Sequence, residues 1–250
     1  MNTVNILGVP IATVNMHQAA NQIEKWIRNR EKAFVTVTGV HGIVESQYDE
    51  KIMRIHRAAG MCVPDGMPTV WIGKLYGYRN MGRVYGPDLM LEIMRRSMGK
   101  EYTHFFYGGK EGVQELLKQR LLSRFPGLKI VGTFYPPFRL MNDKEEIDLQ
   151  EQIEKLSPDI IWVGLSTPKQ EKWMSDHLEK LNTRVMIGIG AAFDFHAGLI
   201  KQAPRWMQHL GLEWFFRLCI EPKRLWKRYL KNNPLFLWEF VLQFLKIKKY

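Results

Sequence analysis

The chain has 250 residues and a hydrophobic content of 46%, enough to bury one α/β domain or a domain with an appendage. This content and the spread of aromatic residues argue against a disordered chain. The formal net charge is +11, and we expect an anionic partner wherever that charge concentrates.

The N-terminal residues contain no basic segment followed by an apolar core, so we expect no signal peptide. No apolar run approaches the roughly 20 residues that span a bilayer. The two cysteines, Cys62 and Cys219, lie in apolar contexts and are interpreted as buried thiols of a reducing compartment. The sequence therefore predicts a cytoplasmic protein.

The predicted elements begin with a hairpin over 4–14 and continue as helices and strands in alternation. The expected helices cover 17–30, 40–57, a stretch beginning near 67, a stretch beginning at 86, 111–124, 143–156 and 168–178, and the expected strands cover 33–37, 61–63, 104–107, 129–134, 159–164 and 184–188. Asp143 and Glu146 fit a capping box at one helix start. This alternation predicts an α/β fold with a Rossmann-like, mostly parallel sheet and helices on both faces.

The pattern changes to helices alone beyond Gly198. Helices are expected over 206–220, 224–231 and 235–247, with breaks at Pro222 and Pro234. We therefore predict an α/β domain over residues 1–198 and a helical C-terminal appendage over 199–250.

The appendage carries most of the charge, because residues 201–250 hold eleven Lys and Arg against three Glu. Arg224 and Arg228 lie four residues apart on one helical face, and Arg217 precedes the break at Pro222. A solvated basic face and packing against a core are the plain interpretations. The density of aromatic residues among these charges favours a helix set that lies on an anionic membrane surface.

Polar or glycine-rich stretches follow the predicted strands. They are T-V-T-G-V-H-G (36–42), P-D-G-M-P (64–68), G-G-K-E-G (108–112), G-L-S-T-P-K-Q-E-K-W (164–173) and G-I-G-A-A-F-D-F (188–195). In parallel sheets ligands bind at the carboxyl ends of strands, so we expect these loops to form a binding site. The Gly108-Gly109 turn exposes backbone N–H groups that can hold phosphate.

Asp65 stands between Pro64 and Gly66, where one of two roles is expected. A carboxylate fixed at the end of a strand can act as a general base. The same residue can cap the helix that begins near Met67. The spacing alone leaves both roles open.

Two further polar positions are candidates for binding. Gln170 lies in the first turn of a helix, where it can bind a sugar or amide, or belong with Glu171 to a capping pattern headed by Thr167. Asp194 lies between two phenylalanines at the end of the last expected strand. A nucleotide's ribose hydroxyls or base N–H groups could be its partner, as could a structural arginine.

Metal-binding patterns are missing from the sequence. The seven histidines include no pair at ligand spacing, and neither C-x-x-C nor Asp-x-Asp occurs. We therefore expect no metal and no other cofactor. The C-terminal arginines are the expected counter-charge for any diphosphate.

Several of these motifs occur in order with R-V-Y-G-P-D-L (83–89), G-A-A-F-D-F-H-A-G (190–198) and G-L-E-W-F-F-R-L-C-I-E-P-K-R-L-W-K-R-Y-L (211–230). Together they resemble the WecG/TagA/CpsF glycosyltransferase family, glycosyltransferase family 26. The resemblance implies an inverting, metal-independent enzyme that transfers a sugar from a UDP donor to a polyprenyl-diphosphate-linked saccharide. The implied sugars are N-acetylmannosamine, its uronic acid, or a glucose-type hexose.

The resemblance also implies roles for individual residues. Asp65 matches the proposed base and Thr36 the polar residue beside it. Gln170 and Asp194 match positions that contact the donor. Further positions expected at the substrate are Thr38, Arg83, Gly108, Gly109 and Gly190, and those expected at the diphosphate or membrane are Arg217, Arg224, Lys227 and Arg228.

One departure concerns the donor sugar. Wall-teichoic-acid members read Thr-x-Asn where this chain reads Thr36-Val37-Thr38, and the shorter Thr38 lacks the amide. The variant resembles exopolysaccharide and capsule members instead. The resemblance implies a peripheral location on the inner face of the cell membrane, and it leaves a homo-oligomer open.

Two other classes compete with this interpretation. The basic appendage could belong to a nucleic-acid-binding protein, which would be retained on DNA or RNA in a salt-sensitive way. The abundance of aromatic and aliphatic residues there argues against nucleic acid. The second class is a non-catalytic nucleotide-sugar-binding subunit of a polymer assembly complex. The combination of Thr36, Asp65 and Gln170 argues against that class.

Overall fold

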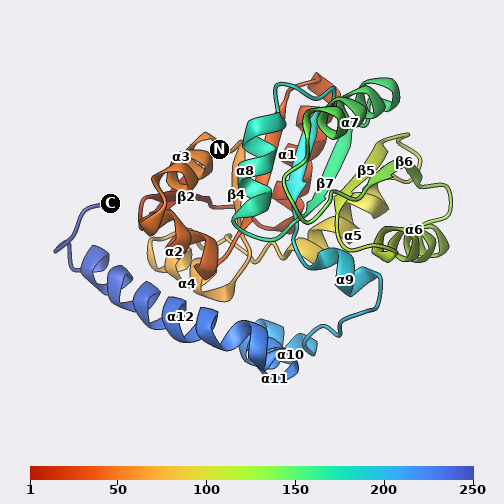
Figure 1. Cartoon of the computed structure of the whole chain (residues 1–250). Coiled ribbons are helices and arrows are strands. Elements are labelled where there is room, and N and C mark those ends of the chain that lie inside the picture. The colour runs from red at the N-terminus through yellow and green to blue at the C-terminus, as the bar shows by residue number, and fades with distance from the viewer. The chain divides into compact units, whose positions relative to one another are not determined.

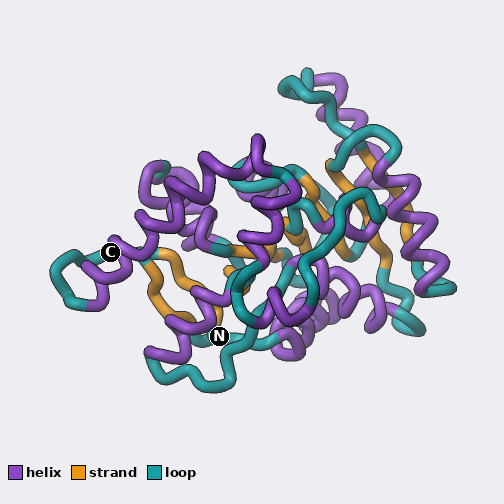
Figure 2. The backbone as a smooth tube through the Cα atoms, turned by 90° about the horizontal axis from the view of Figure 1, so that it is seen from below, coloured by secondary structure: helices purple, strands orange, loops and turns teal.

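The computed structural model describes all of residues 1–250, which divide into two compact units. The first unit comprises 1–16, 37–85 and 201–250, and the second comprises 17–36 and 86–200. The elements can be followed along the chain in Figure 1 and by type in Figure 2. No helix combines the length and the apolar character needed to cross a bilayer.

The first unit is built on a short hairpin and the strand beside it. Its elements are β1 (Thr3–Ile6), β2 (Val9–Ala12), α2 (Val40–Tyr48), α3 (Glu50–Ala58), β4 (Met61–Pro64), α4 (Met67–Leu75), α10 (Arg205–His209), α11 (Glu213–Ile220) and α12 (Pro222–Phe244). Strands β1 and β2 are antiparallel, which confirms the predicted hairpin, and β2 pairs in parallel with β4.

The second unit contains a parallel sheet in the order β3-β8-β7-β5-β6. Its elements are α1 (Met16–Asn29), β3 (Ala33–Thr38), α5 (Gly86–Ser97), β5 (Thr103–Gly108), α6 (Val113–Arg124), β6 (Lys129–Phe134), α7 (Asp143–Leu156), β7 (Ile160–Gly164), α8 (Lys169–His177), β8 (Val185–Gly188) and α9 (Ala192–His196). The central strands are buried on both faces, as in sheets covered by helices. The predicted α/β class with a mostly parallel sheet is confirmed.

Helix α12 packs along α2 and belongs to the core of the first unit (Figure 1). Phe236 is 2% exposed among the apolar side chains of the hairpin, with Leu235 and Phe240 beside it. Gln243 accepts a hydrogen bond of 3.0 Å from the Leu7 N–H and donates one of 3.1 Å to the Asn5 carbonyl. The C-terminal helix is thus joined to the N-terminal hairpin by packing and by hydrogen bonds.

Three predicted element boundaries were wrong. The expected helix over 40–57 is two helices, because the Asp49 side chain accepts hydrogen bonds from Lys51 N and Ile52 N and so caps α3. The expected helix over 206–220 is interrupted at Gly211, whose φ of +72° favours glycine. Conversely, Pro234 lies inside the continuous helix α12.

Two smaller expectations were also wrong. The capping box of α7 consists of Asn142 and Glu145, one residue before the pair expected at Asp143. Cys62 is buried as expected, but Cys219 is exposed on α11. Residues 201–250 belong to the first unit. The predicted domain boundary at residue 198 stays a prediction.

Candidate active site

Asp65 lies in the two-residue turn between β4 and α4 and is partly buried. Its backbone N–H donates to the Thr38 carbonyl over 3.2 Å, which joins this turn to the end of β3. The N-cap of α4 is Gly66, one residue after Asp65. Asp65 is therefore not the N-cap residue of α4.

Gly39 gives the carboxylate room against the backbone. A Cβ added at Gly39 would stand 3.5 Å from Asp65 Oδ2, which is an ordinary contact distance. A larger, branched side chain at position 39 would compete with the Asp65 carboxylate for space. Thr38, which precedes Gly39, is 2% exposed. The T-V-T-G stretch and the P-D-G stretch are thus packed against each other, as the sequence predicts for two strand ends.

Arg83 is held by three groups around the Asp65 turn. Its Nε donates to the Asp65 carbonyl, and its terminal nitrogen pairs with the Glu213 carboxylate at the start of α11. The Tyr85 ring lies under the guanidinium, with 4.1 Å between Arg83 Cζ and the ring centroid. Burial alone would lower the pKa of Arg83, but the negative charges of Asp65 and Glu213 outweigh it and raise that pKa.

The electrostatics of this cluster keep Tyr85 protonated. Burial raises the pKa of Tyr85 far above its usual range, and the Glu213 and Asp65 carboxylates raise it further. Tyr85 therefore contributes a neutral ring and hydroxyl to the site. The carboxylates of this cluster are Asp65 and Glu213, and Glu213 is paired with Arg83.

The basic residues of the C-terminal segment lie on α11 and α12. Burial lowers the pKa of Arg228, and the neighbouring positive charges of Arg224 and Arg217 lower it further. Arg224 is also paired with Glu221, whose Oε1 lies 2.9 Å from Arg224 Nε. Lys227 is exposed, with its ammonium 5.6 Å from the Trp226 ring centroid. Arg217, Arg224 and Arg228 therefore form one cluster of positive charge.

In the second unit, the loops after β5, β7 and β8 converge at neighbouring strand ends. The Gly109 N–H donates to the Gly164 carbonyl over 3.0 Å. At Gly108, with φ of +103°, a Cβ would lie 2.8 Å from that same carbonyl oxygen, so only glycine fits. The Phe193 ring packs on Gly109 and Gly164, at 3.3 and 2.6 Å from their ideal Cβ positions. The predicted convergence of these loops is observed within this unit.

Gln170 joins two of these loops and is 2% exposed. Its Oε1 accepts a hydrogen bond of 3.0 Å from the Gly190 N–H, and its Nε2 donates to Glu171 Oε1 over 3.2 Å. The Thr167 hydroxyl also donates to Glu171 Oε1, over 2.9 Å, so the expected cap at Thr167 is replaced by this bond. Burial raises the pKa of Glu171. The Gln170 side chain therefore holds the loop at Gly190 by a hydrogen bond.

The remaining predicted residues of the second unit are Thr36 and Asp194. Thr36 is fully buried in β3, where it is in register with Gly188 of β8. Asp194 was expected at a strand end, but it lies in the short helix α9 and is partly buried. Its backbone carbonyl accepts hydrogen bonds from the N–H groups of Leu199 and Ile200, which turn the chain after that helix.

Two residues of the cluster were missed by the sequence reasoning: Tyr85 and Glu213. A usable signal was the scarcity of acidic residues in the basic C-terminal segment. Each of its three glutamates forms an ion pair, Glu213 with Arg83, Glu221 with Arg224 and Glu239 with Lys248. Only the first of these pairs connects the segment to a distant part of the sequence.

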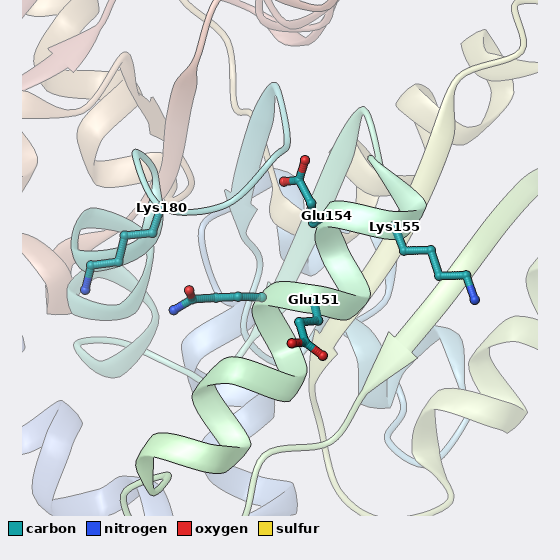
Figure 3. A pocket seen from close by; sticks show the side chains of 5 residues that line it. Glu151, Glu154, Lys155 and Lys180 are labelled. Atoms are coloured by element: carbon teal, nitrogen blue, oxygen red, sulfur yellow. The ribbon is translucent and has the colours of Figure 1, made fainter.

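A shallow surface depression of the second unit is lined by Gln150, Glu151, Glu154, Lys155 and Lys180 (Figure 3). Four of these residues belong to α7, and Figure 3 shows Glu151 and Lys155 directed to different sides of that helix. None of the predicted site residues lines it. The depression has the character of a solvated surface, because its charged side chains extend into open space.

The fold is an α/β fold with a mostly parallel sheet whose loops gather at strand ends, where ligands bind in such sheets. The model of the Glycosyl transferase WecG/TagA/CpsF family matches residues 4–250. The chain belongs to this family and is a glycosyltransferase.

Three similar curated proteins share the name N-acetylglucosaminyldiphosphoundecaprenol N-acetyl-beta-D-mannosaminyltransferase. The protein of Bacillus subtilis (strain 168) is 29% identical over 92% of this chain and 88% of its own length. That of Staphylococcus aureus (strain MRSA252) is 27% identical over 98% of this chain and 95% of its own. That of Bacillus spizizenii is 28% identical over 82% and 77%.

Proposed function

We propose that this enzyme transfers N-acetylmannosamine from a UDP donor to a polyprenyl-diphosphate-linked N-acetylglucosamine, with inversion and without a metal ion. The names of the relatives support the sugar and the acceptor. The replacement of an asparagine by Thr38 keeps the uronic acid and glucose-type donors as the alternatives to test. The product would serve bacterial surface polysaccharide biosynthesis.

The observation that carries the proposal is the placement of Asp65 directly after the end of β4, in the turn that Arg83 holds through the Asp65 carbonyl. In the proposed reaction the acceptor hydroxyl oxygen attacks the anomeric carbon from the face opposite UDP. The new glycosidic C–O bond forms as the bond to the diphosphate oxygen breaks. Asp65 takes the hydroxyl proton, which contributes about 10²–10⁴-fold to the rate. Products are the β-linked disaccharide lipid and UDP.

The positive charge needed by the leaving diphosphate would come from Arg217, Arg224 and Arg228. Burial lowers the pKa of Arg228, and the positive charges of Arg224 and Arg217 lower it further, so an anion bound at this cluster would be stabilising. Guanidinium groups match diphosphate oxygens in geometry and charge. Metal independence is part of this proposal, and undiminished turnover in EDTA is its test. Gln170 and Asp194 stay candidates for contacts with the donor.

The C-terminal helices support a location at the inner surface of the membrane. Polar side chains of α12, such as Gln243, bond to the hairpin, while many apolar side chains remain exposed. The exposed apolar residues of this segment include Trp206, Leu210, Phe215, Ile220, Trp226, Leu230, Leu237, Trp238, Val241, Phe244, Leu245 and Ile247. Apolar and basic side chains together are typical of helices that lie on an anionic bilayer.

The decisive experiment measures UDP release with a panel of UDP-sugars and a synthetic polyprenyl-diphosphate N-acetylglucosamine. We expect release with UDP-N-acetylmannosamine and acceptor together, and no release without acceptor. Release with acceptor and a different UDP-sugar, and not with UDP-N-acetylmannosamine, would change the proposed donor and leave the proposed reaction class in place. Absence of transfer from every donor tested, with a folded protein that binds UDP, would overturn the proposal.

A further inference from the structure

The ion pair of Arg83 with Glu213 joins two segments that are 130 residues apart in the sequence. The two side chains are only 16% and 12% exposed. The neighbouring pair of Arg224 with Glu221 is much more accessible, at 49% and 23%. Removing one partner of a largely buried pair leaves an uncompensated charge, which is strongly unfavourable. The position of Arg83 therefore depends on Glu213.

Arg83 in turn holds the backbone at the proposed base. Its Nε donates to the carbonyl of Asp65 itself, and the next residue, Val84, donates its N–H to the Pro64 carbonyl over 2.8 Å. The stretch that carries Arg83 thus runs beside the Asp65 turn and is bonded to it twice. A shift of the guanidinium would release one of these bonds directly.

On the other side of the pair, Glu213 is the first residue of α11. Arg217 follows four residues later on the same helical face. Burial raises the pKa of Tyr229 on α12, the nearby positive charge of Arg217 lowers it, and the negative charge of Glu213 raises it. Glu213 and Arg217 are thus carried by the same helix, and Arg217 is one of the basic residues assigned above to the diphosphate.

We propose that Glu213 is a positioning residue that couples the docking of α11 to the geometry of the Asp65 turn. Its carboxylate binds Arg83 and not the substrate. Through this ion pair, the position of α11, which carries Arg217, and the position of the Asp65 turn depend on each other. The expected effect of Glu213 substitutions on turnover rests on the proposed function, whereas their expected effect on hydrogen exchange does not.

The coupling predicts a specific pattern for Glu213→Gln. The amide keeps the size of the side chain and loses the charge, so Arg83 is held less firmly and carries an uncompensated positive charge. Turnover should fall at least tenfold. The affinity for UDP should stay the same or rise, because a cation has been exposed beside a site for anions. A purely structural defect would weaken both properties together.

The matched control is Glu239→Gln, which removes the same charge from the same segment, where Glu239 pairs with Lys248. Hydrogen exchange of the full-length protein should become faster at the amides of Asp65 and Val84 and in α11 for Glu213→Gln, and should be unchanged there for Glu239→Gln. This measurement is independent of activity. Lack of transfer by the wild-type protein would count against the proposed function alone.

Two further variants test the coupling, and one of them serves if Glu213→Gln folds poorly. Glu213→Asp keeps the charge and shortens the side chain, so it should show an intermediate effect on exchange and turnover. In a background with Arg83→Met, adding Glu213→Gln should cause no further acceleration of exchange at the Asp65 turn. The proposal is overturned if Glu213→Gln and Glu239→Gln have the same exchange and turnover, or if the effects of Arg83→Met and Glu213→Gln simply add.

Discussion

Gly39 and Asp65 lie against each other, with the position of a Cβ on Gly39 only 3.5 Å from Asp65 Oδ2. The backbone of Gly39, with φ of −105° and ψ of −170°, is open to any residue. A side chain at this position would therefore act on the carboxylate and its surroundings without straining the backbone. Position 39 is thus a steric probe of the space that the proposed base occupies.

Substitution of Gly39 should reduce turnover in proportion to the size of the side chain. Gly39→Ala makes an ordinary contact and should cost about threefold or less, since the added methyl fits at van der Waals distance. Gly39→Val adds branches that compete with the carboxylate and should cost at least about tenfold through misplacement. Steady-state kinetics and thermal unfolding of both variants make the comparison. Equal turnover of the two variants would contradict this placement of Asp65.

Asn232 should anchor α12 on α2. Its Nδ2 donates to His41 Nδ1 over 2.7 Å, and Asn232 is 4% exposed. Asn232→Ala removes this bond and a buried polar partner, so the free energy of unfolding should fall by about 1–3 kcal/mol. Urea unfolding measures the loss, and Asn233→Ala at the neighbouring, more accessible position is the control. An equal effect of the two variants would argue against this anchor.

Gln170 should stabilise the loop at Gly190. Gln170→Ala leaves the Gly190 N–H without its acceptor, so exchange at that amide should accelerate and stability should fall by about 1–3 kcal/mol. Lys169→Ala, at the exposed adjacent position, is the matched control. A variant that loses donor affinity with no change in exchange or stability would assign Gln170 to the substrate alone.

Stability should fall on acidification because of His56. Burial lowers the pKa of His56 from 6.5 to about 4, against the opposing bond to the Ile52 carbonyl. Between these two pH values His56 is protonated in the unfolded chain and neutral in the folded one. This stabilisation is fully present above about pH 6.5 and is lost as the pH falls toward 4, by at most about 3 kcal/mol. His104, with a pKa lowered by burial to about 3, acts in the same direction.

The measurement is urea unfolding at several pH values for the wild type and for His56→Gln. The variant should lose less stability between pH 7 and pH 4.5, with the remaining slope due in part to His104. His17→Gln, at an exposed position, should keep the wild-type dependence. If His56→Gln retains the full slope, His56 is not the group that titrates.

The alternation of strands and helices was predictable because each element carries its own periodic pattern of apolar residues. Boundaries that depend on a single competing interaction were not. Asp49 ended one helix and capped the next, and the capping box chose Asn142 instead of Asp143. Pro234 was expected to break a helix, but the adjacent Leu235 and Phe236 pack on the core of the first unit and α12 continues through it.

The positions of the candidate residues were predictable where they follow strands, since polar loops at the carboxyl ends of strands are the expected binding loops of an α/β fold. That reasoning placed Asp65 directly after β4, and it placed Gly108 and Gly109 at the end of β5, as the structure has them. It could not find Glu213, because an ion pair across 130 residues leaves no local pattern in the sequence. Likewise, the bond between Gln170 and Gly190 appears only when two loops are folded against each other.

The central claim is that Asp65 is the general base, and Asp65→Asn tests it most directly. The amide has nearly the same shape and cannot accept the proton of the acceptor hydroxyl. UDP release with lipid acceptor should fall by about 10²–10⁴-fold, while UDP affinity and thermal stability stay close to those of the wild type. A variant that binds UDP normally and transfers sugar at a near wild-type rate would contradict the account.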